Sequence, residues 1–262
     1  MALDQATVAE LAQLYFQAEH NATPLEPVSR RYPDADEEDA YRVQAALIEL
    51  KIALGRGIVG RKGGATNPGA QAAFGLSQAV YATLFDHGAV VNGGVIELSE
   101  LIHPRLECEV AFRLGADLRG PGQTPESAAA AVAELLAAFE VVDARTVGWQ
   151  AKMLDMIADN VFQARYVLGD QGVSLAGIDP ATITVTLLHN GESAAQASGA
   201  NVLGSPLNAL AWLANRMADH GAYLRAGDLV LAGSLTPLTP IAPGDRFEAV
   251  FDHLGSVRVS FV

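Results

Sequence analysis

The sequence predicts an α+β protein with a mostly β, barrel-like core and a helical layer at its N-terminus. Three observations predict this fold class. Two amphipathic helical patterns fill most of residues 1–60, short strands and turns fill the last third of the chain, and only one or two helical patterns interrupt the strands between them. We therefore expect a helical layer over residues 1–60 and a β-rich domain over residues 61–262, packed as one compact unit.

The composition excludes several classes of protein. Half of the 262 residues are hydrophobic, which is ample for a large core. The net charge of −13 argues against nucleic acid or an anionic membrane as a partner, because both require basic patches. No apolar run approaches the ~20 residues of a transmembrane helix, and the first 20 residues lack the order of a signal peptide, so we expect a cytoplasmic protein. The single cysteine, Cys108, allows neither an intramolecular disulfide nor a cysteine-based zinc site.

The N-terminal layer is predicted from helix caps and apolar spacing. The first helical pattern follows Asp4 and Thr7, either of which can cap it. After a loop with three prolines, Asp36 precedes an acidic first turn, and the helix that it caps should run to residue 54 and end at Gly55.

A glycine-rich stretch follows the helical layer. Residues 58–65 read as a short strand that enters a turn at residues 60–64. The glycines of this turn could let the backbone approach a ligand closely, and Lys62 would then bring a cation to it. A surface turn with solvated basic residues is the alternative.

Two helical patterns lie among the strands. Thr124 caps an alanine-rich helix that we expect to reach about Ala138. Ser205 caps a second helix, which has a regular apolar stripe and ends at Gly221.

The remaining segments read as strands joined by tight turns. Residues 182–188 alternate and end at Asn190-Gly191, which is a strong hairpin signal. Strands are also predicted at residues 229–232, 247–251 and 257–261. The last two form a hairpin with one apolar face, so we expect a strongly curved sheet or a barrel.

Two carboxylates lie one residue apart in the strand predicted at residues 105–112. Glu107 and Glu109 share one face of this strand, while Leu106, Cys108 and Val110 share the other. Adjacent carboxylates repel and raise each other's pKa unless a cation neutralises both, and a hard divalent metal is the simplest such cation. The alternative is a half-exposed strand with two solvated glutamates.

A third acid decides between these alternatives. Glu140 lies in the apolar run at residues 139–143, where a buried glutamate without a partner would be costly. Glu140 is therefore the expected third ligand of the metal. Three oxygen ligands favour Mg²⁺ or Mn²⁺ and leave positions for water and substrate. The commonest small chelators that suit such a site are 2-oxo acids and their enols, and the metal would stabilise an enolate.

With these residues in place, the chain resembles the bacterial 2-keto-4-pentenoate hydratase and 4-oxalocrotonate decarboxylase family, within the fumarylacetoacetate hydrolase superfamily, over nearly its whole length. Its most specific segments are residues 107–109, 139–143, 158–160, 206–209, 212–215 and 226–228. The resemblance implies the barrel-like fold of that superfamily, metal binding by Glu107, Glu109 and Glu140, and Lys62 beside the substrate. It also implies that residues 233–236 line the pocket, with Ser234 and Thr236 as substrate-binding candidates.

The family carries two reactions of aromatic meta-cleavage, and both pass through an enolate that the metal stabilises. One is hydration of 2-hydroxypenta-2,4-dienoate and the other is decarboxylation of 2-oxohex-3-enedioate. Hydratases carry an aspartate where this chain has Val80, a substrate-binding candidate as in decarboxylases. Arg165 matches a decarboxylase arginine and would orient the leaving carboxylate, while Lys62 would polarise the enolate or relay a proton. Asp159 is a further substrate-binding candidate.

Other segments weaken the assignment to the decarboxylases and to their standard substrate. Residues 212–215 and 244–249 look more like the hydratases, which remain the alternative to the favoured decarboxylase. Val161 and Phe162 replace small residues of the family and Ser205 replaces a histidine, so the substrate is expected to be 2-oxohex-3-enedioate or a close relative.

Two further interpretations assign the protein to other functional classes. The altered pocket would also suit a non-catalytic partner subunit of a hydratase, although a scaffold has no use for three clustered carboxylates. Hydrolytic carbon–carbon cleavage would need a general base, for which the histidine candidates are His87, His103 and His253. Each of these is expected to be structural or solvated. The expected partners are a small 2-oxo or 2-hydroxy dienoate and further copies of the chain in a homo-oligomer, which could associate with the pathway hydratase.

Overall fold

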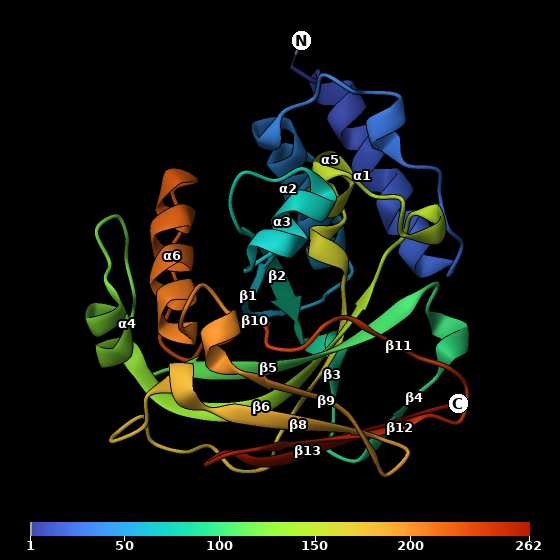
Figure 1. Ribbon diagram of the computed structural model, residues 1–262. Helices are drawn as coiled ribbons and strands as arrows, with labels where there is room; N and C mark the ends of the chain where they lie inside the picture. The colour runs from blue at the N-terminus through green and yellow to red at the C-terminus, as the bar shows by residue number, and fades with distance from the viewer. Residues whose placement is uncertain (1) are drawn as a thin grey trace.

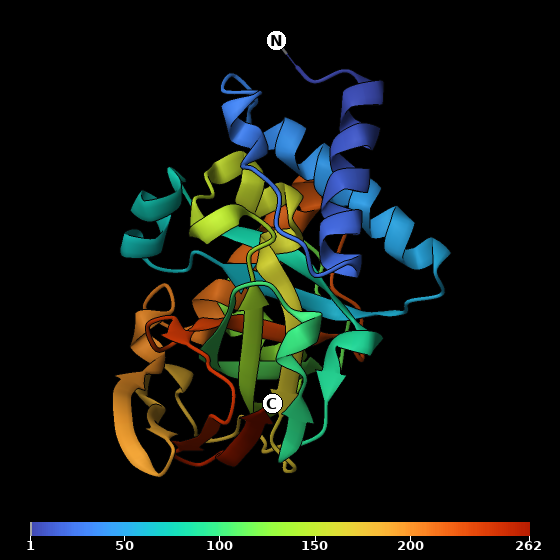
Figure 2. The same ribbon diagram turned by 90° about the vertical axis from the view of Figure 1, so that its right-hand side faces the viewer.

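The structure is a computed structural model that describes residues 2–262, and it contains two β-sheets with the N-terminal helices at one end (Figures 1 and 2). The larger sheet contains β1 (Ile58–Gly64), β2 (Val80–Phe85), β3 (Ala89–Val90), β5 (Pro104–Leu114), β6 (Val132–Asp143), β7 (Gln163–Leu168), β10 (Leu229–Ser234) and β11 (Thr239–Pro240). Its strand order is β2-β1-β10-β5-β6-β7-β3, and β11 pairs with β5 off this path.

The smaller sheet contains β4 (Gly94–Ile96), β8 (Thr184–His189), β9 (Glu192–Ser198), β12 (Arg246–Phe251) and β13 (Gly255–Phe261), in the order β4-β13-β12-β8-β9. The helices are α1 (Gln5–His20), α2 (Glu37–Ala53), α3 (Pro68–Phe74), α4 (Pro125–Ala131), α5 (Met153–Ala158) and α6 (Pro206–Asp219). Within residues 2–262, none of these helices has the length and apolar character needed to span a bilayer.

The N-terminal helices form as their caps predict. The Asp4 side chain accepts from the Thr7 backbone N–H at 2.7 Å and caps α1. Asp36 caps α2 in the same way, and Gly55 adopts a φ of 82° just after the end of that helix. The two helices pack against each other, and α2 packs on α5, on the side of the larger sheet opposite the smaller sheet (Figure 1).

The predicted glycine-rich turn at residues 60–64 is wrong, because these residues lie inside β1. This strand runs between β2 and β10. A Cβ at Gly60 would lie 1.8 Å from the Leu229 carbonyl oxygen, and one at Gly64 would lie 2.4 Å from Cγ1 of Val161. The glycines therefore permit close packing within and against the sheet, and they do not form a turn.

Gly60→Ala should be strongly destabilising because the backbone of β10 occupies the space that the new methyl group needs. We expect the free energy of unfolding to fall by about 3 kcal/mol. Gly69→Ala is the matched control, since a Cβ there meets only Oδ1 of Asn67, at 3.3 Å. Urea unfolding of both variants measures the difference, and equal midpoints would contradict this packing.

The predicted helix from Thr124 to Ala138 is also wrong in its second half. The helix α4 ends at Ala131, and β6 begins at Val132. Residues 132–138 have helix-forming side chains, but they pair along β5 and extend the strand that carries Glu140. Tertiary pairing here overrides the local helical propensity.

The C-terminal predictions are confirmed. Asn190 and Gly191 have φ values of 53° and 89° and join β8 to β9, as a tight hairpin turn requires. Ser205 caps α6 with its side chain. The strands β12 and β13 form the predicted hairpin, and their buried residues join the main core.

The alternation of β5 separates two apolar environments. Leu106, Cys108 and Val110 are fully buried in the main core. The opposite face carries Glu107 and Glu109, followed by a separate small cluster made of Leu84, Ala111, Leu136, Ala138, Tyr166, Leu229 and Leu231. The two glutamates therefore lie next to an apolar cluster that excludes water from one side of them.

Candidate active site

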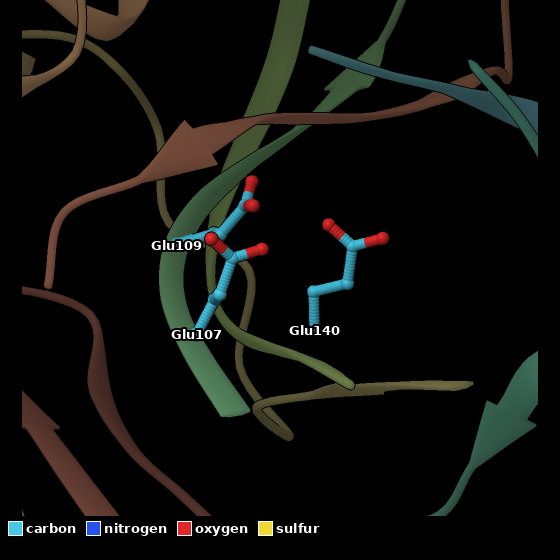
Figure 3. A group of neighbouring side chains, drawn as sticks. All are labelled: Glu107, Glu109 and Glu140. Atoms are coloured by element: carbon cyan, nitrogen blue, oxygen red, sulfur yellow. The ribbon is translucent and has the colours of Figure 1, made fainter. Parts of the chain in front are cut away.

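Three glutamates from two neighbouring strands converge in the larger sheet (Figure 3). Glu107 on β5 lies directly opposite Glu140 on β6 in the antiparallel register, and Glu109 follows on the same face. One carboxylate oxygen of each residue lies within 4.8 Å of those of the other two. Glu109 and Glu140 are fully buried and Glu107 is partly exposed. The solvated-glutamate alternative is thereby excluded.

Burial and mutual repulsion make this cluster of acids unfavourable by itself. Burial, followed by the charge of Glu140, raises the pKa of Glu107 to about 7. Burial also raises the pKa of Glu109 well above its usual range, and the charges of Glu140 and Glu107 add to the effect. The pKa of Glu140 is raised by burial, although Lys62 opposes the shift. A second cation would be needed to keep all three groups ionised at neutral pH.

The cluster contains one cation, Lys62, and one buried oxygen atom that has no partner among the described residues. Nζ of Lys62 donates to Oε2 of Glu140 at 3.1 Å and lies 3.0 Å from Oε1. The Gly233 backbone N–H donates to Oε2 of Glu109 at 2.7 Å. Within residues 2–262, the buried Oε1 of Glu109 has no hydrogen-bond partner, and Oε1 of Glu140 has only its ion-pair contact with Lys62. An all-oxygen donor set that contains a buried oxygen without a partner fits a hard divalent cation such as Mg²⁺ or Mn²⁺.

A cavity of about 230 Å³ opens onto this cluster. Its wall is formed by Lys62, Gly63, Gly64, Ala65, Thr66, Asn67, Ala70, Phe74, Glu107, Val142, Trp149, Met156, Val161, Phe162, Ser234, Thr236, Pro237 and Leu238. Lys62, Glu107, Ser234 and Thr236 were all candidates from the sequence, and the structure brings them to one cavity. Most of the remaining wall is apolar.

The end of β10 and the loop after it supply two polar residues of the wall, Ser234 and Thr236. The Ser234 hydroxyl donates to the Thr236 carbonyl oxygen at 2.7 Å, and the Thr236 hydroxyl accepts from the Cys108 backbone N–H at 3.3 Å. Gly233 has a φ of 119°, and a Cβ there would lie 2.3 Å from Oγ1 of Thr66. Only glycine fits this position, where its backbone N–H reaches Glu109.

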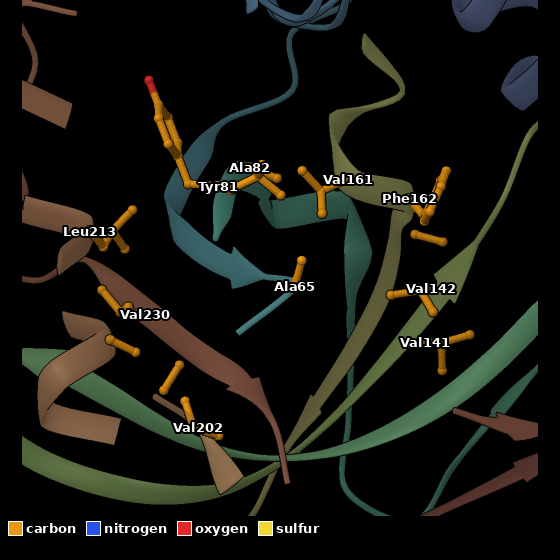
Figure 4. Close-up of a cluster of buried hydrophobic side chains, with 14 of the residues drawn as sticks. Ala65, Tyr81, Ala82, Val141, Val142, Val161, Phe162, Val202, Leu213 and Val230 are labelled. Carbon is orange, nitrogen blue, oxygen red and sulfur yellow. The ribbon is translucent and has the colours of Figure 1, made fainter. Parts of the chain in front are cut away.

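A left-handed turn forms another part of the wall (Figure 4). Asn160, Val161 and Phe162 have consecutive φ values of 48°, 50° and 62°. The Asn160 amide both accepts from the N–H and donates to the carbonyl oxygen of Thr83, each at 2.9 Å. A β-branched residue rarely adopts this conformation, so the two side-chain bonds of Asn160 hold a strained segment that places Val161 and Phe162 at the cavity.

Three aromatic residues, Phe74, Trp149 and Phe162, form a contiguous part of the wall, which we term the aromatic wall. The ring centroids of Phe74 and Phe162 are 5.7 Å apart, and those of Trp149 and Phe162 are 5.2 Å apart. Nε1 of Trp149 donates to the His103 carbonyl oxygen at 2.9 Å. Sequence reasoning missed Phe74 and Trp149, because both lie in segments without a recognisable motif.

Two predicted site residues on or near β7 do not reach the cavity. Arg165 pairs in register with Val141, so it points to the face of the sheet opposite Glu140, and its guanidinium lies 2.8 Å from Glu100. Asp159 is fully buried against Arg145: its Oδ1 accepts from Nε at 2.7 Å and its Oδ2 accepts from the backbone N–H at 2.9 Å.

Val80 also lies outside the cavity wall. It is fully buried on β2, and its Cγ2 would lie 3.4 Å from a Cβ at Gly64. Val80 therefore lies behind Gly64, which does line the cavity. An acidic side chain is absent from this position, but the valine itself does not form part of the wall.

Asp159→Asn should lower stability without weakening the metal site. Removing one partner of a buried ion pair typically costs about 3 kcal/mol or more. Chemical unfolding measures this loss, and calorimetric titration with Mg²⁺ should give an unchanged affinity. The control is Asp117→Asn in the exposed pair with Arg119, where we expect a much smaller loss of stability because solvent screens the two charges. Weaker Mg²⁺ binding by the Asp159 variant would contradict the structural role.

Comparison with known proteins gives consistent matches over the chain. The model of the fumarylacetoacetate (FAA) hydrolase C-terminal family matches residues 80–262. A 2-keto-4-pentenoate hydratase of Paraburkholderia xenovorans (strain LB400) is 38% identical over 252 residues, covering 96% of this chain and 94% of the relative. A 4-oxalocrotonate decarboxylase of Pseudomonas putida is 35% identical over 260 residues, covering 99% and 98%.

Solved structures agree with these matches. The 4-oxalocrotonate decarboxylase from Pseudomonas putida G7, complexed with magnesium and adipate, has a TM-score of 0.97 and 34% identity, covering 100% of this chain and 99% of that one. A fumarylpyruvate hydrolase from Pseudomonas aeruginosa shares the fold with a TM-score of 0.62, covering 77% and 88% at 16% identity. The predicted fold class and family resemblance are thereby confirmed. The chain belongs to the fumarylacetoacetate hydrolase family and, like the hydratases and decarboxylases that it matches over its full length, is a lyase.

Proposed function

We propose that this lyase is a divalent-metal-dependent decarboxylase of 2-oxohex-3-enedioate, or of a close relative, in aromatic meta-cleavage catabolism. The observation that carries the proposal is the composition of the cavity wall. Among the described residues, Lys62 and Glu107 are the only ionisable side chains that line it. Adding water to a double bond requires an acid–base group beside the reacting carbon. Loss of carbon dioxide requires an electron sink at one end and no base at the other.

Glu107, Glu109 and Glu140 would hold the metal. A bound Mg²⁺ or Mn²⁺ supplies Lewis-acid stabilisation of negative charge that develops on the C2 oxygen of the substrate. The decarboxylase from Pseudomonas putida G7 is complexed with magnesium and with adipate, a six-carbon dicarboxylate. That relative supports both the metal and the length of the proposed substrate.

The proposed reaction is a vinylogous decarboxylation. The C5–C6 bond breaks and its electron pair becomes the C4–C5 double bond. The C3–C4 double bond shifts to C2–C3, and the C2 oxygen takes the charge and then a proton. The products are carbon dioxide and 2-hydroxypenta-2,4-dienoate.

Lys62 is the group that would supply positive charge and a proton at the C2 oxygen. Its ammonium is buried, lines the cavity and is held 3.0 Å from Glu140. The Thr236 hydroxyl, which accepts a hydrogen bond from the Cys108 N–H, would donate to the carboxylate end of the substrate, and Ser234 would do the same by turning its hydroxyl away from the Thr236 carbonyl oxygen. The aromatic wall would exclude water from the carbon chain, so that the enolate is protonated by the protein and not hydrated.

The second candidate is 2-hydroxypenta-2,4-dienoate hydratase, favoured by the 38% identity to the hydratase of Paraburkholderia xenovorans. In this interpretation Lys62 would have to activate the water, since Glu107, the other ionisable side chain of the wall among the described residues, would hold the metal.

A product assay separates the two reactions. The protein is incubated with Mg²⁺ and either 2-oxohex-3-enedioate or 2-hydroxypenta-2,4-dienoate, and both carbon dioxide and the diene absorbance are followed. We expect one carbon dioxide per dicarboxylate consumed and no consumption of the dienoate. Hydration of the dienoate without carbon dioxide release from the dicarboxylate would replace the decarboxylase with the hydratase. A parallel reaction with EDTA controls for spontaneous decay.

A further inference from the structure

Arg105 is a half-buried cation near the cavity that the proposed reaction does not use. Arg105 precedes Glu107 by two residues on β5, so the two side chains share a face of the strand. In the part of the chain that the structure describes, the Arg105 guanidinium has neither a carboxylate partner nor a side-chain hydrogen bond. Its only specific contact is with the ring of Trp149, whose centroid lies 4.2 Å away.

Arg105 lies beside two residues of the cavity wall. It pairs in register with Val142, and Val142 and Trp149 both line the cavity. Arg105 is not itself a wall residue, but it lies beside Val142 and Trp149, and two residues along a strand place it about 6.7 Å from Glu107. The span of an extended six-carbon chain is of the same order.

The surroundings hold this charge in place. Trp149 is fixed by its hydrogen bond to the His103 carbonyl oxygen and by its edge contact with Phe162. The Arg105 guanidinium lies over the face of this fixed indole in a cation–π contact. An unpaired guanidinium beside an apolar cavity attracts a carboxylate strongly, because the apolar wall provides little screening.

We propose that Arg105 is a specificity-determining residue that selects 2-oxo acids with a second, distal carboxylate. It acts as the counter-charge for that carboxylate and is positioned by Trp149. The inference rests on the proposed function and takes over the role that the sequence suggested for Arg165, which faces the other side of the sheet and pairs with Glu100. Because it stabilises the carboxylate before that group leaves, Arg105 should act on substrate affinity more than on kcat.

The test compares two unreactive ligands that differ only at the distal end. These are 2-oxoadipate, which has a second carboxylate, and 2-oxohexanoate, which lacks it. Their Kd values are measured by calorimetry in saturating Mg²⁺ for the wild type and for Arg105→Met, Arg105→Lys and Arg165→Met.

The wild type should bind 2-oxoadipate about tenfold more tightly than 2-oxohexanoate, since one additional charge contact in such a site is worth about one decade in Kd. Arg105→Met should remove this preference by weakening 2-oxoadipate alone. Arg105→Lys should retain most of the preference, and Arg165→Met should retain all of it.

Equal weakening of both ligands by Arg105→Met would show that Arg105 only supports Trp149, and it would overturn the inference. A preference that survives Arg105→Met or disappears in Arg165→Met would overturn it as well. In these cases the proposed function stands, because both ligands still bind. If neither ligand binds the wild type in Mg²⁺, the proposed function fails and this inference fails with it.

Discussion

Glu107→Gln should reduce the Mg²⁺-dependent kcat/KM for 2-oxohex-3-enedioate by at least about 10³-fold, because the electrophilic contribution of a bound metal is worth several kcal/mol. Glu107 is the one residue that belongs both to the glutamate cluster and to the cavity wall. Glutamine keeps the size of the side chain but removes the negative charge. Steady-state carbon dioxide release at several Mg²⁺ concentrations measures the effect.

The matched control is Glu134→Gln, on the other strand that contributes to the cluster. Glu134 lies near the opposite end of β6, where it pairs with Arg113 at 2.9 Å on the surface. This variant should keep the wild-type rate and Mg²⁺ dependence. A Glu107→Gln protein that is folded by circular dichroism and active without added metal would remove the basis of the proposal.

Lys62→Met should lower kcat for decarboxylation by about 10²-fold or more, which is the usual loss when a positioned proton donor is removed. Lys62 lies on β1, contacts Glu140 and lines the cavity. Methionine has a similar length and fills the buried space, so the fold should persist when Mg²⁺ supplies the lost positive charge. The measurement is single-turnover carbon dioxide release at saturating Mg²⁺.

The control for this variant is Lys152→Met, an exposed lysine at the start of α5, which should leave kcat unchanged. If Lys62→Met lost only Mg²⁺ affinity and regained full kcat at high Mg²⁺, Lys62 would be a structural partner of Glu140 and not a proton donor.

The central part of the site could be predicted from the sequence because it follows from local geometry. The alternation of a strand places Glu107 and Glu109 on one face, and an apolar run around Glu140 predicts a buried acid that needs a partner. The caps at Asp4, Asp36 and Ser205 were predicted equally well, since a cap is formed by residues that are neighbours in the chain.

The errors concern contacts between distant segments. The glycines of β1 resemble a turn until β10 is known to lie against Gly60. Residues 132–138 resemble a helix until β5 pairs with them. Arg165 resembles a substrate ligand in sequence, but its register against Val141 directs it to the opposite face.

Two of the three residues of the aromatic wall, Phe74 and Trp149, were missed for a related reason. Phe74, Trp149 and Phe162 come from three separate segments, and nothing in their local sequences indicates that they meet. The left-handed turn at Asn160 that places Phe162 at the cavity depends on two hydrogen bonds to Thr83, which is 77 residues away in the chain. Such a contact is visible only in the folded structure.

The central claim is that Glu107, Glu109 and Glu140 bind the divalent metal on which the reaction depends. Anomalous diffraction from crystals grown with Mn²⁺ tests it most directly. We expect a single strong anomalous peak within bonding distance of one oxygen from each of the three carboxylates, and loss of that peak in Glu109→Gln. A peak elsewhere in the chain, with none between the three glutamates, would contradict it.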